Sequence, residues 1–292
     1  MTEQLKLKLN DSKATRWGAL VIVAFTMMAA YYVNDVVAPL KTMLETDLAW
    51  SSTDFGFFTG GYSFLNVFFL MLIWGGLILD RFGIRFTGKL ATILMVGGTA
   101  LEYYAMTGLA GADATLFGIK EIFGYKTGVF VAFAGYSIFG VGAEVAGITV
   151  SKIIAKWFKG KELATAMGVQ VALARIGSQA GYAVAIPLAR AFGISTPVLL
   201  GLVLLLGGMI AFFIFAVMDK KLDKQMEAAA IAAGTEDEEE KFSFKDVKNI
   251  LVNPGFWLIA LLCVLFYSCV FPFQKFASEL MIIKYGINEN VA

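Results

Sequence analysis

The sequence predicts an all-α transmembrane protein, and its composition and patterning both lead to this prediction. Hydrophobic residues make up 58% of the 292 positions and charged residues 16%, whereas about 25% of the residues in a typical soluble domain are charged. Apolar runs of about 20 residues, the length that crosses a bilayer as a helix, recur along the chain. The formal net charge is only +1, so we expect no basic surface that could hold nucleic acid.

Seven runs are long and apolar enough to form membrane-spanning helices. The first is too long for the core of a signal peptide and is followed by no small-residue cleavage pattern, so we interpret it as a spanning helix. The seven runs cover approximately residues 17–44, 55–79, 86–109, 128–151, 163–189, 196–218 and 254–283.

The lysine and arginine residues between these runs predict the orientation, because cytoplasmic connections carry a surplus of them. The connections on one side, including the segment before Trp17, contain 17 of these residues, and those on the other side contain 4 before the seventh run. We therefore expect a cytoplasmic amino terminus, with a lipid bilayer around the helices.

The runs divide the chain into three parts. Residues 1–218 are expected to form a six-helix bundle, residues 219–253 a cytoplasmic linker, and residues 254–292 a seventh helix that begins a second bundle. The linker contains the acidic run 236–240, which repels itself and is interpreted as solvated rather than as a binding site. Six helices, a long linker and the start of another bundle are typical of one half of a two-bundle transporter. The rest of the second bundle, which transport would need, is expected to lie outside this chain.

Several kinds of catalytic chemistry lack their usual residues. The sequence contains no histidine, which removes the commonest general base and an important metal ligand. Its two cysteines, Cys263 and Cys269, lie in one apolar run and are interpreted as packing residues. Because no cluster of residues has metal-ligand spacing, we expect no metal site, no cofactor and no enzymatic activity.

The connection between the second and third runs reads GLILDRFGIR, beginning at Gly76. Gly76 would let a neighbouring helix approach closely, and Gly83 would permit a tight turn. Asp80, Arg81 and Arg85 would form a charged latch at the cytoplasmic rim, made in one conformation and broken in another. The alternative is a loop whose arginines only fix the orientation. The motif resembles the signature of the major facilitator superfamily, which implies an amino-terminal six-helix bundle of a two-bundle transport fold.

A second stretch narrows this resemblance. WFKGKEL, residues 157–163, and RIGS, residues 175–178, are similar to the region of the fourth and fifth helices in the lysosomal dipeptide uniporter branch of the superfamily and its bacterial relatives. VFPF, residues 270–273, agrees as well. The chain departs from the branch after Asp35, where two valines replace its Asn-Pro, and in residues 111–126, which we expect to form an extra outside loop.

Ionisable residues inside membrane-spanning helices are costly, which makes them candidates for function. Glu144 lies 12 residues before Lys156 and Arg175 lies 14 residues after Lys161, so at the helical rise they are ~18 Å and ~21 Å deep. Spacing alone leaves two interpretations. The residues form a permanent salt bridge between two helices, or they face a shared cavity and bind a substrate there.

The resemblance implies the second interpretation. In the lysosomal branch the matching residues bind the two ends of a dipeptide, which assigns Glu144 to the amino group and Arg175 to the carboxylate. A planar guanidinium suits a carboxylate well. Asn66 on the second helix falls at a similar depth, and Tyr62 lies one turn farther out on the same face. We expect both to contribute to the substrate site.

Two further acids lie nearer the outer rim. Asp35 is 19 residues from Arg16 and Glu102 is 17 residues from Arg85, which places them ~28 Å and ~25 Å from the cytoplasmic charges. Asp35, which we include in the predicted substrate site, either lines the cavity or makes an outer gating contact. Glu102 is interpreted as an interfacial charge.

These observations predict a secondary transporter of small zwitterionic solutes, dipeptides foremost, that works by alternating access and facilitated diffusion. A proton-coupled symporter that uses Asp35 or Glu144 is the alternative. A seven-helix receptor is the alternative from another class, against which the cytoplasmic amino terminus argues. No acidic-dileucine sorting signal precedes Trp17, so we expect a prokaryotic inner membrane rather than a lysosome.

Overall fold

The computed structural model describes residues 8–111, 114–233 and 249–287. The predicted acidic run 236–240 lies outside the described residues. The described chain is almost entirely helical, which confirms the predicted all-α class. Its elements are η1 (Leu9–Asp11), α1 (Lys13–Val36), η2 (Ala38–Leu40), α2 (Lys41–Asp47), α3 (Ser52–Phe68), α4 (Met71–Thr107), β1 (Glu121–Ile122), β2 (Tyr125–Lys126), α5 (Thr127–Trp157), α6 (Leu163–Phe192), α7 (Thr196–Ala233) and α9 (Pro254–Tyr285).

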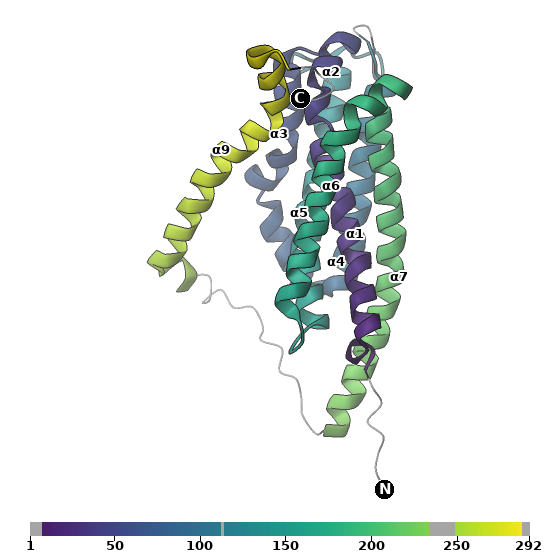
Figure 1. The fold of residues 1–292 in the computed structure, drawn as a ribbon, viewed down its shortest axis with the longest axis vertical. Helices are drawn as coiled ribbons and strands as arrows, with labels where there is room; N and C mark the ends of the chain where they lie inside the picture. The colour runs from purple at the N-terminus through teal and green to yellow at the C-terminus, as the bar shows by residue number, and fades with distance from the viewer. Residues whose placement is uncertain (1–7, 112–113, 234–248, 288–292) are drawn as a thin grey trace. The chain divides into compact units, whose positions relative to one another are not determined.

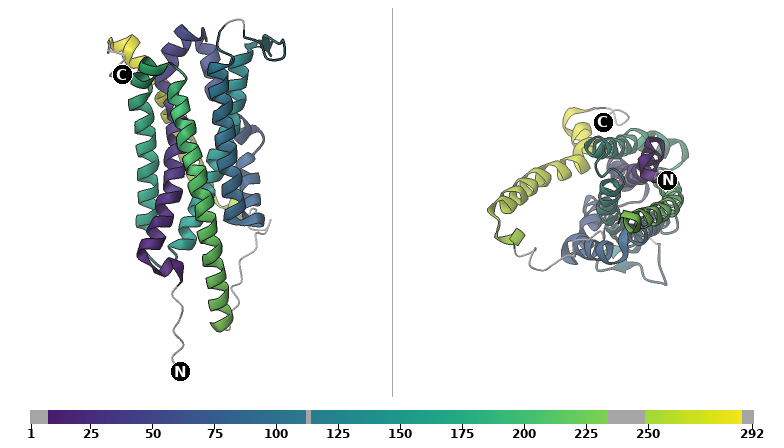
Figure 2. Two further views of the ribbon diagram at one scale, coloured as in Figure 1. Left: turned by 90° about the vertical axis from the view of Figure 1, so that its right-hand side faces the viewer. Right: turned by 90° about the horizontal axis from the view of Figure 1, so that it is seen from below.

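The chain divides into two compact units, Met1–Glu227 and Ala228–Ala292. In the first unit the long helices run side by side (Figures 1 and 2), with α5 packed mainly on α4 and α3, and α6 on α1. The start of α1 and the α5–α6 connection lie at one end of this unit, and α2 lies at the opposite end together with the small β1–β2 hairpin. The hairpin falls in the segment expected as an extra loop.

Two residues with positive φ angles shape the region of the second and third predicted runs, and the first of them divides the second run, expected as one helix over residues 55–79, into α3 and the start of α4. Leu70 has φ 52° and separates α3 from α4, and the two helices are bent by 58° at this break. Gly83 has φ 75° and interrupts α4, in agreement with the turn expected there. Glycine adopts this backbone region without the steric penalty that a side chain would bring.

Seven membrane-spanning runs were predicted, but fewer of the described helices are each long and apolar enough to cross a membrane. Four described helices qualify, and the bent pair of α3 and α4 makes up to five. The second and third runs are not counted separately because α4 continues across Gly83. The fifth run, α6, carries polar residues in its middle, including Gln170, Arg175 and Gln179, which lower its mean hydropathy. Several long apolar helices still indicate an integral, multi-pass membrane protein.

The helix of the sixth run is longer than its apolar part. α7 continues through Asp219 and ends at Ala233, within the segment expected to be a linker, because the charged residues that follow Met218 are good helix formers. In the second unit, Asn253 caps the amino-terminal end of α9, and its side chain accepts a hydrogen bond from the backbone of Gly255 at 2.8 Å. Pro272 lies inside α9.

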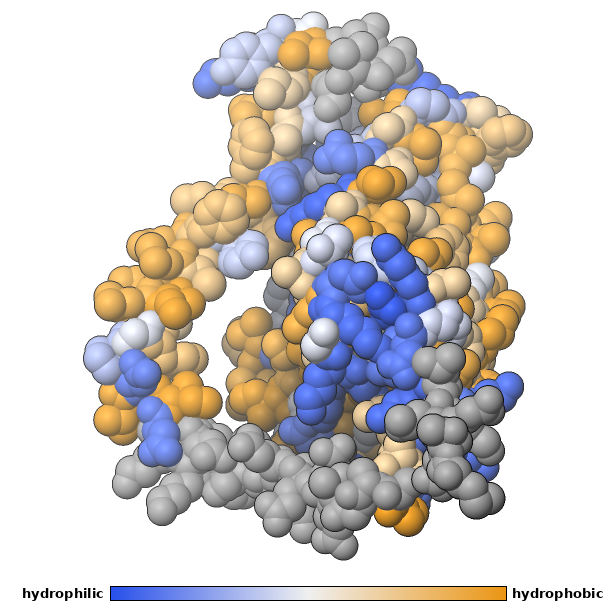
Figure 3. All heavy atoms as spheres, turned by 60° about the horizontal axis from the view of Figure 1, so that its bottom comes forward, coloured by the Kyte–Doolittle hydropathy of each residue, from blue (hydrophilic) through white to orange (hydrophobic). Residues whose placement is uncertain are grey.

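The first unit buries large aromatic side chains between its helices and exposes apolar residues on its sides. Fully buried rings include those of Phe55, Tyr136 and Trp157, and exposed apolar residues such as Val67 and Ile210 suit contact with lipid. Hydrophilic residues gather at the end of the unit that is turned toward the viewer in Figure 3. This distribution separates a polar end from an apolar middle, as a membrane requires.

Candidate functional site

Glu144 and Tyr62 meet where α5 packs against α3. The Tyr62 hydroxyl donates a hydrogen bond to Oε1 of Glu144 at 2.8 Å. Gly140, one turn before Glu144, makes this possible, because a Cβ atom at Gly140 would collide with the backbone carbonyl of Tyr62. Both side chains are partly buried. The acid of the predicted site is therefore held in a fixed position by a neutral donor.

Arg175 contacts an aromatic ring from α1. Its guanidinium carbon lies 5.5 Å from the centre of the Tyr31 ring, within the range of a cation–π interaction. Gly177, two residues later, packs directly on the backbone of Met28, which brings α6 against α1 at this level. Arg175 is itself exposed in the first unit, so its charge is accessible.

The predicted acid and base do not pair with each other. Among the ion pairs of the described residues, none joins Glu144 to Arg175. Each instead contacts an aromatic residue, Glu144 the hydroxyl of Tyr62 and Arg175 the ring of Tyr31. The permanent salt bridge that spacing alone allowed is thus not formed in this conformation. A carboxylate and a guanidinium remain, each in contact with a different phenol.

The other predicted substrate residues occupy supporting positions. Asn66 donates to the backbone carbonyl of Tyr62 at 3.0 Å and not to Glu144. Asp35 is buried and accepts a hydrogen bond from Nδ2 of Asn34 at 2.8 Å. The hydroxyl of Tyr136 in turn donates to the backbone carbonyl of Asn34 at 2.8 Å. Asp35 therefore belongs to a buried polar network of α1 and α5.

Glu102 was expected to be an interfacial charge, and this is wrong. Its side chain is 0% exposed. The reason is the close packing of α4 on α5, where a Cβ atom at Gly135 would lie 2.7 Å from the carbonyl oxygen of Gly98 and 2.9 Å from the backbone nitrogen of Glu102. Counting residues gave the depth of Glu102 along the helix, but it could not show which face α5 would cover.

The motif between the second and third runs makes contacts that differ from the expected latch. Asp80 pairs with Lys152 of α5 at 2.9 Å, and Arg85 pairs with two aspartates of α7, as described below. Arg81 stacks over the neighbouring ring of Phe82. Asp80, Arg81 and Arg85 thus do not close on one another. Each of the two ion-paired residues reaches a different helix.

The close approach expected at Gly76 occurs one residue earlier. A Cβ atom at Gly75 would lie 2.5 Å from Cγ2 of Val145, whereas a Cβ atom at Gly76 would meet nothing within 4 Å. A one-residue shift on a helix rotates the side-chain direction by about 100°. The motif placed a glycine contact correctly on the helix and assigned it to the wrong face.

A buried aspartate that sequence reasoning missed lies at the centre of the polar end. Asp219 of α7 is 0% exposed and accepts hydrogen bonds from Lys156 at 2.7 Å and from the indole of Trp157 at 3.0 Å. Arg85 lies 3.4 Å from it and 2.5 Å from Asp223. The four-residue spacing of the two aspartates at the end of an apolar run was the available signal. It places both on one helical face.

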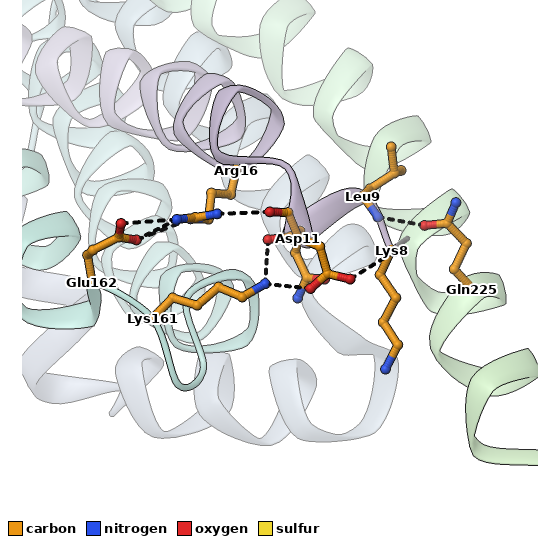
Figure 4. Close-up of polar contacts among 8 residues, drawn as sticks. Lys8, Leu9, Asp11, Arg16, Lys161, Glu162 and Gln225 are labelled. Carbon is orange, nitrogen blue, oxygen red and sulfur yellow. Dashed lines mark hydrogen bonds and ion pairs between the residues drawn. The ribbon is translucent and has the colours of Figure 1, made fainter. Parts of the chain in front are cut away.

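A second polar cluster ties the segment before α1 to the α5–α6 connection (Figure 4). Arg16 binds Glu162 through two nitrogens, with a shortest distance of 2.8 Å, and Lys161 binds Asp11 at 2.8 Å. The backbone nitrogen of Leu9 donates to the side chain of Gln225 in α7 at 2.8 Å. These contacts hold the ends of α1, α6 and α7 together.

Hydrogen bonds within this second cluster change the acidity of its carboxyl groups. The bond from Lys161 lowers the pKa of Asp11 below its ordinary value, and the bond from Arg16 lowers the pKa of Glu162. A donor that binds the ionised carboxylate stabilises the charged form. Both pairs are therefore charged at neutral pH.

The sequence is similar to a known protein family and to several proteins of known name. A family model described as the Major Facilitator Superfamily matches residues 20–289. The lysosomal dipeptide transporter MFSD1 of Homo sapiens is 27% identical over 293 residues, covering 96% of this chain and 57% of that protein. The Danio rerio protein of the same name is 27% identical over 278 residues, covering 91% of this chain and 54% of that protein. The Gallus gallus protein is 33% identical over 171 residues, which cover 54% of this chain and 36% of that protein. The chain spans about half the length of the first two relatives.

Proposed function

Since the chain belongs to the major facilitator superfamily, we propose that it supplies the first helical bundle of a secondary transporter for small zwitterionic solutes, dipeptides foremost. Relatives of about twice its length are named as dipeptide transporters. The substrate moves by alternating access, in which the two bundles rock about a central site. A seven-helix receptor has no such support from the family.

The observation that carries this proposal is the separation of Glu144 from Arg175. A free dipeptide presents an ammonium group and a carboxylate at opposite ends, and each loses its hydration on entering a confined site. Opposite charges must replace that hydration. Glu144, oriented by Tyr62, suits the ammonium group, and Arg175, stacked on Tyr31, suits the carboxylate. A dipeptide that bridges them would connect α5 to α6.

The polar end supplies the contacts that change during transport. Asp80 and Lys152 pair at the surface, where each side chain is about half exposed, so this pair is cheap to break. At the centre of the other cluster, Asp219 is 0% exposed, so its pairs are harder to break. We therefore place the conformational latch of this half at Asp80, with Gly83 as the turn that carries it. Transport is by facilitated diffusion, and the driving force is the gradient of the solute.

Uptake of labelled dipeptide into liposomes tests the proposal, with the protein expressed at full length. Glu144→Gln and Arg175→Ala should each abolish uptake, whereas Lys220→Gln, on the exposed surface of α7, should not. Blocked peptides separate the two roles. In the parent protein, an N-acetylated dipeptide, which lacks the ammonium group, should compete only weakly for uptake because it cannot pair with Glu144. An amidated dipeptide, which lacks the carboxylate, should compete only weakly because it cannot pair with Arg175. Uptake that survives both substitutions would refute the proposal.

The orientation and location are part of the same proposal. We place the amino terminus, the α5–α6 connection and the polar end of the first unit in the cytoplasm, and the protein in a prokaryotic cell membrane. Labelling of a cysteine introduced at Lys161 by an impermeant reagent tests the orientation. Reaction in intact cells, without permeabilisation, would contradict it. Membrane fractionation tests the location.

A further inference from the structure

The basic side chains at the polar end of the first unit make two kinds of contact. Several, such as Arg16 and Lys156, bind carboxylates of the protein. Arg81 and Lys89 of α4 contact aromatic rings instead, and none of the ion pairs among the described residues includes either of them. These two charges therefore suit an anionic group that the described part of the chain does not supply.

Lys89 lies where α4 packs against α7. Gly88, the residue before it, permits this close approach, because a Cβ atom there would collide with the ring of Phe212. The Nζ atom of Lys89 lies 5.2 Å from the centre of the Phe213 ring, within the range of a cation–π interaction. Phe213 is exposed and Lys89 is partly exposed. A cation of one helix thus meets a ring of another at the surface of the bundle.

The aromatic surface extends along α4 to Arg81. Phe86 is three residues from Lys89 and shares its face of the helix. Phe82 and Phe86 are both exposed, and their ring centres lie 5.1 Å apart across the interruption at Gly83. The guanidinium carbon of Arg81 lies 5.5 Å from the centre of the Phe82 ring. We define the basic–aromatic patch as Arg81, Phe82, Phe86, Lys89 and Phe213.

The depth of Lys89 indicates the chemistry of the occupant. After the turn at Gly83, α4 runs from the polar end into the apolar middle, and Lys89 lies four residues, or ~6 Å, beyond Arg85. Farther into the membrane, Ile93 of α4 and Ile210 of α7 are exposed. An ammonium group in hydrocarbon is costly, so a lysine at this depth extends its stem along apolar surface toward the lipid phosphates.

We propose that the basic–aromatic patch binds one anionic phospholipid from the leaflet at the polar end. The phosphate pairs with Lys89, and Arg81 at the turn adds a second positive charge. The acyl chains lie along the rings and reach Ile93 and Ile210. An anionic lipid matches both parts of this surface, because basic residues between membrane helices attract anionic headgroups and exposed apolar side chains suit acyl chains. The proposal needs only the leaflet at the polar end, so it holds for either orientation of the protein.

Native mass spectrometry of the protein at full length tests the headgroup. Phosphatidylglycerol should bind more tightly than phosphatidylcholine with the same acyl chains, by about fivefold for each cation at the headgroup. Lys89→Gln should reduce this preference by about fivefold and Lys89→Arg should retain it. Lys159→Gln, on the exposed α5–α6 connection, should leave it unchanged. Glycerol phosphate, which carries the charge without acyl chains, should not compete.

Three results would overturn the proposal. They are equal affinities for the two lipids in the parent protein, an unchanged preference in Lys89→Gln, and competition by glycerol phosphate, which would indicate a site for free anions. The first and the third need no variant, so they decide the matter even where Lys89→Gln folds poorly.

Crosslinking in the parent protein locates the lipid. A phosphatidylglycerol analogue with a photoreactive group along one acyl chain should label α4 near Ile93 and α7 near Ile210. Unlabelled phosphatidylglycerol should suppress this labelling more strongly than phosphatidylcholine does. Labelling confined to other helices would contradict the proposal. Neither measurement uses a peptide, so the result is independent of the transport function proposed above.

Discussion

Replacing Asp219 with alanine removes the acid at the centre of the buried polar cluster. Asp219 accepts hydrogen bonds from Lys156 at 2.7 Å and from Trp157 at 3.0 Å, and it lies 3.4 Å from Arg85. Its own side chain is 0% exposed, and those of Lys156 and Arg85 are 23% and 38% exposed. The substitution therefore leaves the indole N–H of Trp157 without its acceptor and removes one of two carboxylates from Lys156 and Arg85, which keep their pairs with Asp223.

The expected loss follows from this burial. Removing one partner of a buried ion pair costs about 3–5 kcal/mol. The partial exposure of the bases and their remaining pairs with Asp223 favour the lower end of that range, about 3 kcal/mol. At about 2 °C per kcal/mol for a chain of this size, the midpoint of thermal unfolding should fall by about 6 °C. The matched control is Asp80→Ala, because the Asp80–Lys152 pair has side chains 51% and 49% exposed. It should cost less than about 1 kcal/mol.

Thermal unfolding of the two variants in one detergent gives the comparison. The difference between them should be several degrees, with Asp219→Ala the less stable. Equal midpoints would show that burial of Asp219 does not govern the strength of the cluster, and the assignment of the latch to the surface pair Asp80–Lys152 would lose its physical basis.

Three further outcomes follow from the geometry of the bundle. Tyr62→Phe removes the hydroxyl that orients the acid of the peptide site. A hydrogen bond to a charged group contributes about 1.5–3 kcal/mol. The apparent peptide affinity should therefore fall by about tenfold or more, while the melting temperature changes little. Gly75→Ala should destabilise the protein by about 1–3 kcal/mol through overpacking, whereas Gly76→Ala in the open position should be neutral or slightly stabilising, as thermal unfolding would reveal. The bond from Arg16 lowers the pKa of Glu162, so the pair's contribution to folding stability is complete at neutral pH and is lost as the pH falls below about 4. The difference in stability between the parent protein and Arg16→Gln should therefore close in that range. A difference that persists there would contradict the assignment.

The fold class and the family could be predicted from sequence because they depend on features that are local in the chain. Apolar runs report on their surroundings directly, and the turn at Gly83 requires a residue without a side chain. The family match confirms the superfamily that the GLILDRFGIR motif resembles. The break at Leu70 could not be predicted, because leucine is a good helix former and nothing in its neighbours signals a left-handed backbone.

The partners of the charged residues were harder to predict because they depend on which helix faces which. The motif identified Arg85, but its partners Asp219 and Asp223 are more than 130 residues away and come close only when α7 packs at the polar end. For the same reason, the burial of Glu102 and Tyr136 between helices could not be predicted from the sequence. A residue count gives depth along a helix axis, and rotation about that axis is set by close contacts such as that between Gly98 and Gly135.

The most direct test of the central claim measures peptide-dependent thermal stabilisation of the protein at full length. A dipeptide at about 100 times its dissociation constant should stabilise the folded state by about 2.7 kcal/mol through linkage. Glu144→Gln and Arg175→Ala should each abolish this stabilisation without a comparable loss of basal stability, since the two residues make no ion pair with each other among the described contacts. Stabilisation by dipeptide that persists in both variants would contradict the account.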